Sequence, residues 1–271
     1  MNFEVEEIQF ENVSDNTIFD SLKTEWRKSL TAPQDDMWET FTEFAEHWKI
    51  NFKNQTIGYA CVNSDNCLLQ FFLIPEWIQT GSSIFEKFAH QLKIQKAIIG
   101  TNNPHCLSMA MNFQESVEIQ FYLFSDYLNE KVGDKEGTLR LVKIDELEKF
   151  VEFCHISTGG PKDWLSGYVS NLITKGEYFV FEEKGEILGI CEVRKSETNP
   201  KVANLGMIVS PNHRKKGLGT FLLGKAKEIS LEWKREPICG CEKENIGSLK
   251  AIHKNGFRSI HQMLLLKFGS Q

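Results

Sequence analysis

Residues 203–220 constrain the fold of this chain more than any other stretch, because their character changes twice over a short distance. An apolar run ends at Pro211, a basic turn with two glycines occupies 214–219, and an amphipathic run begins at Phe221. This order predicts a strand, a tight turn and a helix. Backbone N–H groups at the start of a helix are unpaired and attract anions, and glycines let a ligand approach closely. The segment therefore predicts a site for a phosphorylated cofactor.

Two motifs carry a resemblance to a known family. The spacing Arg-x-x-Gly-x-Gly at 214–219 resembles the acyl-CoA pyrophosphate loop of the GNAT superfamily of N-acetyltransferases. Residues 245–257 resemble the later helix of that family, which begins at an Asn, has a small residue three positions on and ends in Gly-Phe. A strand-like run at 238–242 separates the two motifs. The resemblance covers roughly the last half of the chain.

The resemblance implies an N-acetyltransferase that transfers an acetyl group from acetyl-CoA, as co-substrate, to a primary amine by direct attack, without a metal. The strand before the loop is expected to run beside the pantetheine arm of the cofactor, and one of its N–H groups to polarise the thioester carbonyl. The residues expected to bind the cofactor are Met207, Ile208, Val209, Arg214, Lys215, Lys216, Gly217, Leu218, Gly219, Thr220, Asn245 and Ser248.

The general acid departs from the family pattern. The position seven after Asn245 commonly holds a Tyr that protonates the departing CoA thiolate, and this chain has Ile252. His253 is one residue further on, which rotates it by about 100° around the helix. Ser248, Cys241 or a bound water are the alternatives for protonating the thiolate.

Two carboxylates are the candidates for the general base. Glu192 lies on the strand before 203–209, and Glu242 lies at the end of the strand after the loop. Either can accept the proton that an attacking amine must lose. Glu192, Glu242 and Ser248 are therefore the catalytic candidates, and Tyr168 is a candidate for lining the acceptor pocket.

The first half of the chain resembles the second. One constant offset pairs Pro75 with Pro211 and Gly81 with Gly217. A polar stretch at 131–138 separates the halves and predicts a linker. The expected fold class is α/β (α+β), with two tandem GNAT-like domains at 1–132 and 138–271. Each is expected to be a mixed, mostly antiparallel twisted sheet flanked by helices.

The first half is predicted to be degenerate. Residues 78–83 occupy the position of the basic loop but lack its Arg, both Lys and its second Gly. Without them the turn loses its positive field and the close backbone approach that a diphosphate needs. This half is expected to be structural and to form a wall of the acceptor cleft. The alternative is an unrelated α+β domain.

The second half is expected to follow the order βααβββαβαββ. One helix is expected from Asp145, where a capping-box spacing is followed by apolar residues at the helical period. A second helix is expected after Pro161. Strands are expected at 139–143, 178–181, 187–193, 203–209 and 238–242. The second and third of these are expected to form a hairpin with its turn at Lys184-Gly185. A final pair of strands is expected at 257–260 and 262–268.

Composition narrows the class of protein. The net charge of −6 argues against a general nucleic-acid binder, and the apolar runs are too short for a membrane helix. The acidic N-terminus is unlike a signal peptide, and seven cysteines without Cys-x-x-Cys spacing suit a reducing compartment. The expectation is a cytoplasmic monomer or homodimer that acts on a small-molecule amine, with no nucleic-acid or membrane partner.

Two other functions are compatible with a glycine-rich loop. The missing Tyr at position 252 leaves open a non-catalytic, acyl-CoA-binding regulatory protein. A dinucleotide-binding fold would need a third small residue where Leu222 stands, and would leave 245–257 unexplained.

Overall fold

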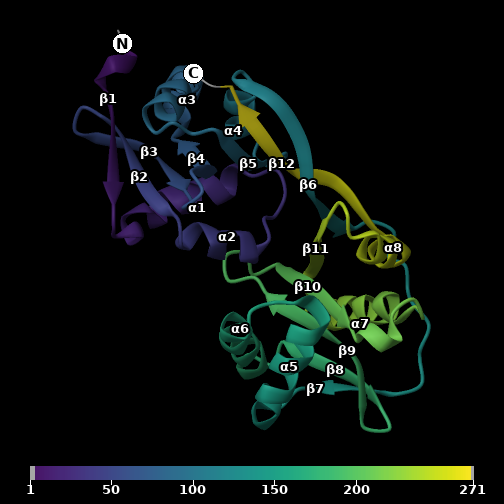
Figure 1. The fold of residues 1–271 in the computed structure, drawn as a ribbon. Helices are drawn as coiled ribbons and strands as arrows, with labels where there is room; N and C mark the ends of the chain where they lie inside the picture. Colours follow the sequence, from purple (N-terminus) through teal and green to yellow (C-terminus); the bar gives the residue numbers. More distant parts are fainter. Residues whose placement is uncertain (1–3, 270–271) are drawn as a thin grey trace. The chain divides into compact units, whose positions relative to one another are not determined.

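The computed structural model of the chain describes residues 4–269. The chain forms two compact units, one of residues 1–122 with 261–271 and the other of residues 123–260. Figure 1 shows sheets flanked by helices in both. No helix within residues 4–269 is long and apolar enough to cross a membrane.

The second unit carries the predicted motifs. Its strands follow the order β11-β10-β9-β8-β7, antiparallel except for the parallel pair β10–β11. The elements are β7 (Thr138–Leu141), η4 (Ile144–Glu146), α5 (Leu147–Thr158), α6 (Lys162–Thr174), β8 (Tyr178–Glu183), β9 (Glu186–Lys195), β10 (Val202–Val209), η5 (Pro211–His213), α7 (Leu218–Glu232), β11 (Glu236–Glu242), α8 (Ile246–Lys254) and the first residues of β12 (Phe257–Phe268).

The first unit repeats this pairing scheme. Its strands follow the order β1-β2-β3-β4-β5-β12, again antiparallel except for one parallel pair, β4–β5. The elements are η1 (Val5–Glu7), β1 (Ile8–Val13), η2 (Asn16–Phe19), α1 (Asp20–Ser29), α2 (Asp36–Glu43), β2 (Glu46–Phe52), β3 (Gln55–Val62), β4 (Cys67–Leu73), η3 (Pro75–Thr80), α3 (Gly81–Gln91), β5 (Lys96–Gly100), α4 (Pro104–Ala110), most of β6 (Gln114–Asp126) and the remainder of β12.

The end of the chain differs from the prediction. The expected strand pair at 257–260 and 262–268 is wrong, because the structure has one continuous strand, β12 (Phe257–Phe268). No Gly or Pro interrupts this stretch, so the two residues that most strongly break a strand are absent from it.

The compact units and the predicted domains, 1–132 and 138–271, have different limits. Residues 123–137 group with the second unit. Residues 261–271 group with the first, because Met263–Lys267 of β12 pair with Gly100–Lys96 of β5. Segments that are distant in sequence therefore complete the first unit.

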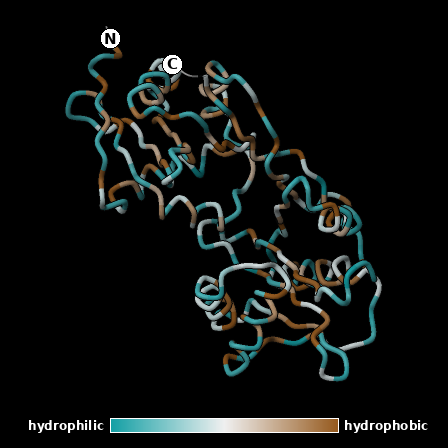
Figure 2. The backbone as a smooth tube through the Cα atoms, in the orientation of Figure 1, coloured by the Kyte–Doolittle hydropathy of each residue, from teal (hydrophilic) through white to brown (hydrophobic). Residues whose placement is uncertain are grey.

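In the second unit, helices cover both faces of the sheet. Val180 of β8 packs against Phe150 of α5 and Val169 of α6 on one face. On the other face, Phe181 packs against Phe221 of α7, with ring centroids 4.7 Å apart. Because side chains alternate along a strand, neighbouring residues of β8 serve opposite layers. In Figure 2 these strands are mostly brown, whereas the segment between β6 and β7 is teal and white.

Candidate functional site

The turn between η5 and α7 presents a series of unpaired backbone amides. Lys215 and Gly217 adopt positive φ angles of 64° and 78°, which turns the chain sharply into the helix. The first hydrogen bond of α7 is from Phe221 N–H to Gly217 O, at 3.1 Å. Within residues 4–269, the amides from Lys215 to Thr220 have no protein acceptor. Such a nest of N–H groups at a helix start attracts an anion.

Gly219 leaves space beside this nest. A Cβ at this position would lie 3.6 Å from the Met207 thioether and 3.7 Å from Ala251, which are ordinary contact distances. The first turn of α7 thus faces both β10 and α8 with no side chain between them at residue 219. Lys215 and Lys216 are exposed next to it.

The Arg214 side chain is not a free cation, because its guanidinium is hydrogen-bonded to two backbone carbonyls. Its guanidinium donates to Ser157 O at 2.6 Å and to Val209 O at 3.4 Å. These bonds tie the loop to the end of α5 and to the end of β10. The side chain is therefore a brace of the loop, and its charge lies beside the unpaired amides.

We expect Arg214→Gln and Arg214→Lys to lower Tm by a similar few degrees, because both lose the planar fork that spans two carbonyls. Their affinities for acetyl-CoA should differ. The lysine variant keeps the positive charge and should bind within about threefold of the wild type, whereas glutamine should bind about tenfold more weakly. Differential scanning fluorimetry and isothermal titration calorimetry measure the two effects. Equal affinity of the two variants would show that the charge is irrelevant.

Residues 127–137, the segment between β6 and β7, are anchored along α7. The Lys227 ammonium is buried, lies 2.8 Å from an Asp126 carboxylate oxygen and donates to the carbonyls of Glu130 and Asn255. Further along, Asp134 pairs with Lys225 of α7 at 2.9 Å. The segment therefore follows the helix back towards its N-terminus.

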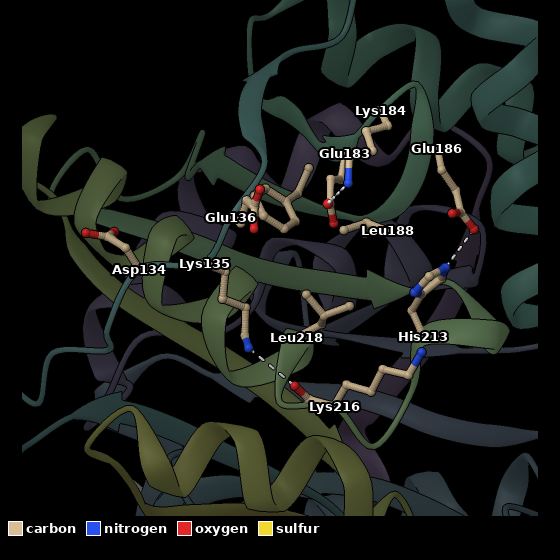
Figure 3. Close-up of a pocket in the computed structure, with 11 residues that line it drawn as sticks. Asp134, Lys135, Glu136, Glu183, Lys184, Glu186, Leu188, His213, Lys216 and Leu218 are labelled. Atoms are coloured by element: carbon tan, nitrogen blue, oxygen red, sulfur yellow. Dashed lines mark hydrogen bonds and ion pairs between the residues drawn. The ribbon is translucent and has the colours of Figure 1, made fainter.

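Lys135 brings this segment to the loop. Its ammonium donates to Lys216 O at 3.4 Å, as the dashed line in Figure 3 shows. In a trans peptide the carbonyl and the following N–H point in opposite directions, so this contact favours an orientation in which the Gly217 N–H points away from Lys135. The cavity in Figure 3, of about 740 Å³, lies between this segment, the β8–β9 turn and His213, which bonds Glu186 at 2.7 Å.

Strands β10 and β11 separate beside the loop. They pair only over Val202–Asn204 with Glu236–Ile238, whereas β10 pairs with β9 through Val209. Ser210 N–H donates to Leu188 O. Backbone groups alternate along a strand, so those of Ile208 also face β9, and those of Met207 and Val209 face the side of β11. Among the described residues these last two have no strand partner on that side.

Glu192 lies against this opening. It pairs in register with Gly206 of β10, and a Cβ at Gly206 would overlap its carboxylate. Tyr168 of α6 donates its hydroxyl to the carboxylate, at 2.8 and 2.9 Å from the two oxygens. The Arg194 guanidinium is 3.3 Å away. The carboxylate is thus oriented by two side chains from different elements.

The surroundings of Glu192 are polar and largely buried. The Tyr178 hydroxyl lies 2.9 Å from Cys154 Sγ, and burial raises the pKa of both groups, that of Cys154 to about 11. Trp164 stacks on Tyr168 with ring centroids 4.8 Å apart and is 47 % exposed. Sequence reasoning identified Tyr168 as a pocket residue but missed Arg194. The signal was present, because residues two apart on a strand share a face.

The other catalytic candidates lie on β11 and α8. Glu242 is exposed at the end of β11. Cys241 hydrogen-bonds through its thiol to Glu242 O at 3.3 Å, and burial raises its pKa although a hydrogen bond with Ser248 lowers it. Asn245 caps α8 by accepting from Ser248 N–H at 3.1 Å. The structure brings Ser248 together with Cys241, not with Glu192.

Position 252 on α8 does not supply an acid, and position 253 lies at the surface of the helix. Ile252 is buried and has no ionisable group. His253 is exposed and makes an edge contact with Phe124, with centroids 5.6 Å apart. Within residues 4–269, no group of three His, Cys, Asp or Glu side chains is arranged to hold a metal.

The loop of the first unit has another structure. Residues 75–80 form the 3-10 helix η3, which continues into α3, and Gly81 N–H bonds Ile78 O. Gly81 has a helical φ of −58°, and a Cβ there would overlap Met109. At least one backbone amide of this turn is thus hydrogen-bonded within the chain, unlike those of the second unit. The space beside Gly81 is filled by the Met109 side chain.

The comparisons with known families agree on both halves. The family model described as "Acetyltransferase (GNAT) domain" matches residues 15–127. The one described as "Acetyltransferase (GNAT) family" matches residues 140–257. The two matches leave residues 128–139 between them. No curated protein matches the chain.

Solved structures show the same fold over the whole chain. A GNAT-family acetyltransferase from Colwellia psychrerythraea superposes with a TM-score of 0.92 at 24% identity, covering 96% of this chain and 100% of its own. A tandem GNAT protein from the clavulanic acid biosynthesis pathway gives 0.65 at 14% identity, covering 98% and 100%. A GCN5-related N-acetyltransferase from Sphaerobacter thermophilus gives 0.66 at 13% identity, covering 96% and 95%.

Proposed function

Since the chain consists of two GNAT domains in tandem and thereby belongs to the GNAT superfamily, we propose that its second domain transfers an acetyl group from acetyl-CoA to a primary amine. The observation that carries the proposal is the opening between β10 and β11. It is bounded by unpaired amides at Lys215–Thr220 and by the Glu192 carboxylate.

The chain offers matching groups for the diphosphate and the pantetheine arm of acetyl-CoA. The amides from Lys215 to Thr220, with the exposed Lys216, suit the diphosphate. The backbone groups of Met207 and Val209 that face β11 suit the amides of the pantetheine arm. Gly219 adds no side chain to the space between Met207 and Ala251. We assign cofactor binding to this surface.

Glu192 is assigned as the general base. An amine attacks only as the neutral species and must lose a proton as its bond to the acetyl carbon forms. The thioester supplies an activated carbonyl, and an unpaired N–H on the β11 side of β10 can stabilise the charge that develops on its oxygen. Tyr168 and Arg194 hold the carboxylate in place.

Protonation of the departing thiolate is assigned to the Cys241–Ser248 pair. Cys241 carries a thiol proton; burial raises the pKa of this thiol, and the hydrogen bond with Ser248 opposes that shift. Glu242, exposed on the same strand, has no comparable environment. The base and the acid then lie on different strands, on either side of the opening.

The first domain is proposed to have no transferase activity. The surface that corresponds to the one carrying Glu192 is filled by a buried cluster that includes Phe19, Trp26, Tyr59 and Phe72. Its loop lacks the basic residues and is helical. Its predicted role as a wall of the acceptor cleft stays a prediction.

Release of free CoA from acetyl-CoA across a broad panel of primary amines tests this function. A thiol-reactive dye detects the product, and mass spectrometry confirms the N-acetyl amine. The second candidate, a non-catalytic acyl-CoA-binding protein, is favoured by Ile252, which cannot donate a proton. Tight binding of acetyl-CoA without release of CoA on any amine would support that candidate instead.

A further inference from the structure

Asn204 has a buried side-chain amide without partners. The residue is 0% exposed, and within residues 4–269 neither its Oδ1 nor its Nδ2 has a hydrogen-bond partner. Buried polar groups in proteins are nearly always bonded, because an unbonded amide loses its contacts with water and gains nothing in return. An amide that lacks both partners indicates a bonding group from outside the chain.

The position of Asn204 indicates where that group binds. It is the last residue of β10 that pairs with β11, opposite Ile238. The two strands separate at the next residue, so the amide lies at the closed end of the opening. The amide has no contact with bulk solvent in this structure, so a molecule that bonds it must displace side chains that cover it.

The register places Asn204 on the same face as Glu192. Asn204 pairs with Arg194 of β9, and Gly206 pairs with Glu192. Residues two apart on a strand share a face, so the amide and the carboxylate are neighbours along it. Gly206 has no side chain that could separate them. An acceptor nitrogen beside Glu192 would thus lie close to the Asn204 amide.

We propose that Asn204 is a substrate-positioning residue that selects primary amines. The inference rests on the proposed transferase function. Asn204 Oδ1 accepts one N–H of the neutral amine and holds the nitrogen with its lone pair towards the thioester carbonyl. The N–C bond forms, the other amine proton passes to Glu192, the C–S bond breaks, and the CoA thiolate takes a proton.

This arrangement uses both hydrogens of the amine. A secondary amine has one N–H, which it must give up to Glu192, so it has none left for Asn204. Its N-methyl group would instead face the amide and leave it unbonded. The wild-type protein should therefore discriminate against an N-methyl amine, and the loss of Asn204 should remove most of that discrimination.

Stability provides a readout that needs no substrate. Asn204→Val removes an unbonded amide and places a β-branched residue in a buried strand, so its Tm should rise by about 2–4 °C. Asn255 is the matched control. It is also 0% exposed, but its Nδ2 donates to Thr220 O at 2.9 Å and to Ala251 O at 2.8 Å. Asn255→Val should lower Tm.

The kinetic experiment uses full-length protein, the best primary amine of the panel and its N-methyl derivative. Asn204→Val should lower kcat/KM for the primary amine by about 10–100-fold, leave acetyl-CoA affinity unchanged and bring the two amines within about threefold of each other. Asn204→Leu repeats the measurement in case valine does not fold.

The outcomes separate this inference from the function on which it rests. A lower Tm for both Asn204 variants would show that the amide has a structural role and would overturn the proposal. Unchanged discrimination between the two amines would overturn it as well. If the wild-type protein binds acetyl-CoA but acetylates no amine in the panel, the transferase function fails, and this inference fails with it.

Discussion

Valine in place of Gly219 is expected to weaken acetyl-CoA binding by about 100-fold or more while the protein stays folded. The diphosphate must reach the unpaired amides of Lys215–Thr220, and the γ-methyl groups of valine would occupy its approach. Charge-assisted hydrogen bonds of about 1.5–3 kcal/mol each would be lost. Two of them account for a change of this size.

The fold should tolerate this substitution. The added Cβ meets side-chain atoms of Met207 and Ala251 at 3.6 and 3.7 Å, which are ordinary contact distances. Gly219 lies in the first turn of α7, and a side chain there reduces the conformational entropy of the unfolded chain. Tm should therefore stay within a few degrees of the wild type.

Gly167→Val is the matched control. Gly167 lies in α6, and a Cβ there would have nothing within 4 Å. This variant should bind acetyl-CoA like the wild type. Isothermal titration calorimetry gives the affinities, and thermal unfolding checks the fold. A folded Gly219→Val protein with wild-type affinity would refute the assignment of the diphosphate to this turn.

Glutamine in place of Glu192 is expected to lower kcat/KM by about 10²–10⁴-fold, the usual contribution of a general base. The shape of the side chain is kept, and the Tyr168 hydroxyl can still donate to its remaining oxygen. The proton acceptor is lost. Since the substitution does not touch the loop, acetyl-CoA affinity should stay the same, which steady-state kinetics together with calorimetry can show.

Two further variants serve as comparisons for Glu192→Gln. Glu242→Gln should change kcat/KM less than twofold, because Glu242 is exposed at the end of β11. Tyr168→Phe should lower kcat/KM by about 3–10-fold, because it removes one of the groups that orient Glu192. A large loss in the Glu242 variant with full activity in the Glu192 variant would exchange the roles of the two carboxylates.

The conformation of the glycine-rich turn at 214–219 was predictable because its determinants are local. Proline ends a strand, glycine permits positive φ and a helix start leaves amides unpaired, wherever these residues stand in a fold. Gly217 does adopt a positive φ, of 78°. The tandem arrangement of two GNAT domains, predicted from a weak internal repeat, is confirmed by the two family matches.

Other features depended on residues that meet only in the folded chain. The break predicted before Gln262 is wrong, since β12 runs without interruption and pairs with β5 over Met263–Lys267. Arg214 is a brace of the loop because α5 places Ser157 O within reach. Neither contact can be predicted from the residues next to it in the sequence.

The amino-acid sequence determined the superfamily, the tandem repeat and the position of the loop, since each is recognised from short motifs whose own residues lie within a few positions of one another. The tertiary structure decided the surroundings of the two candidate carboxylates. Glu192 and Glu242 are equivalent as residues on strands, and only the register of β9 against β10 places one of them over Gly206, beside Tyr168. It also left the Asn204 amide unbonded, because partners for a buried group come from elements that are distant in the chain.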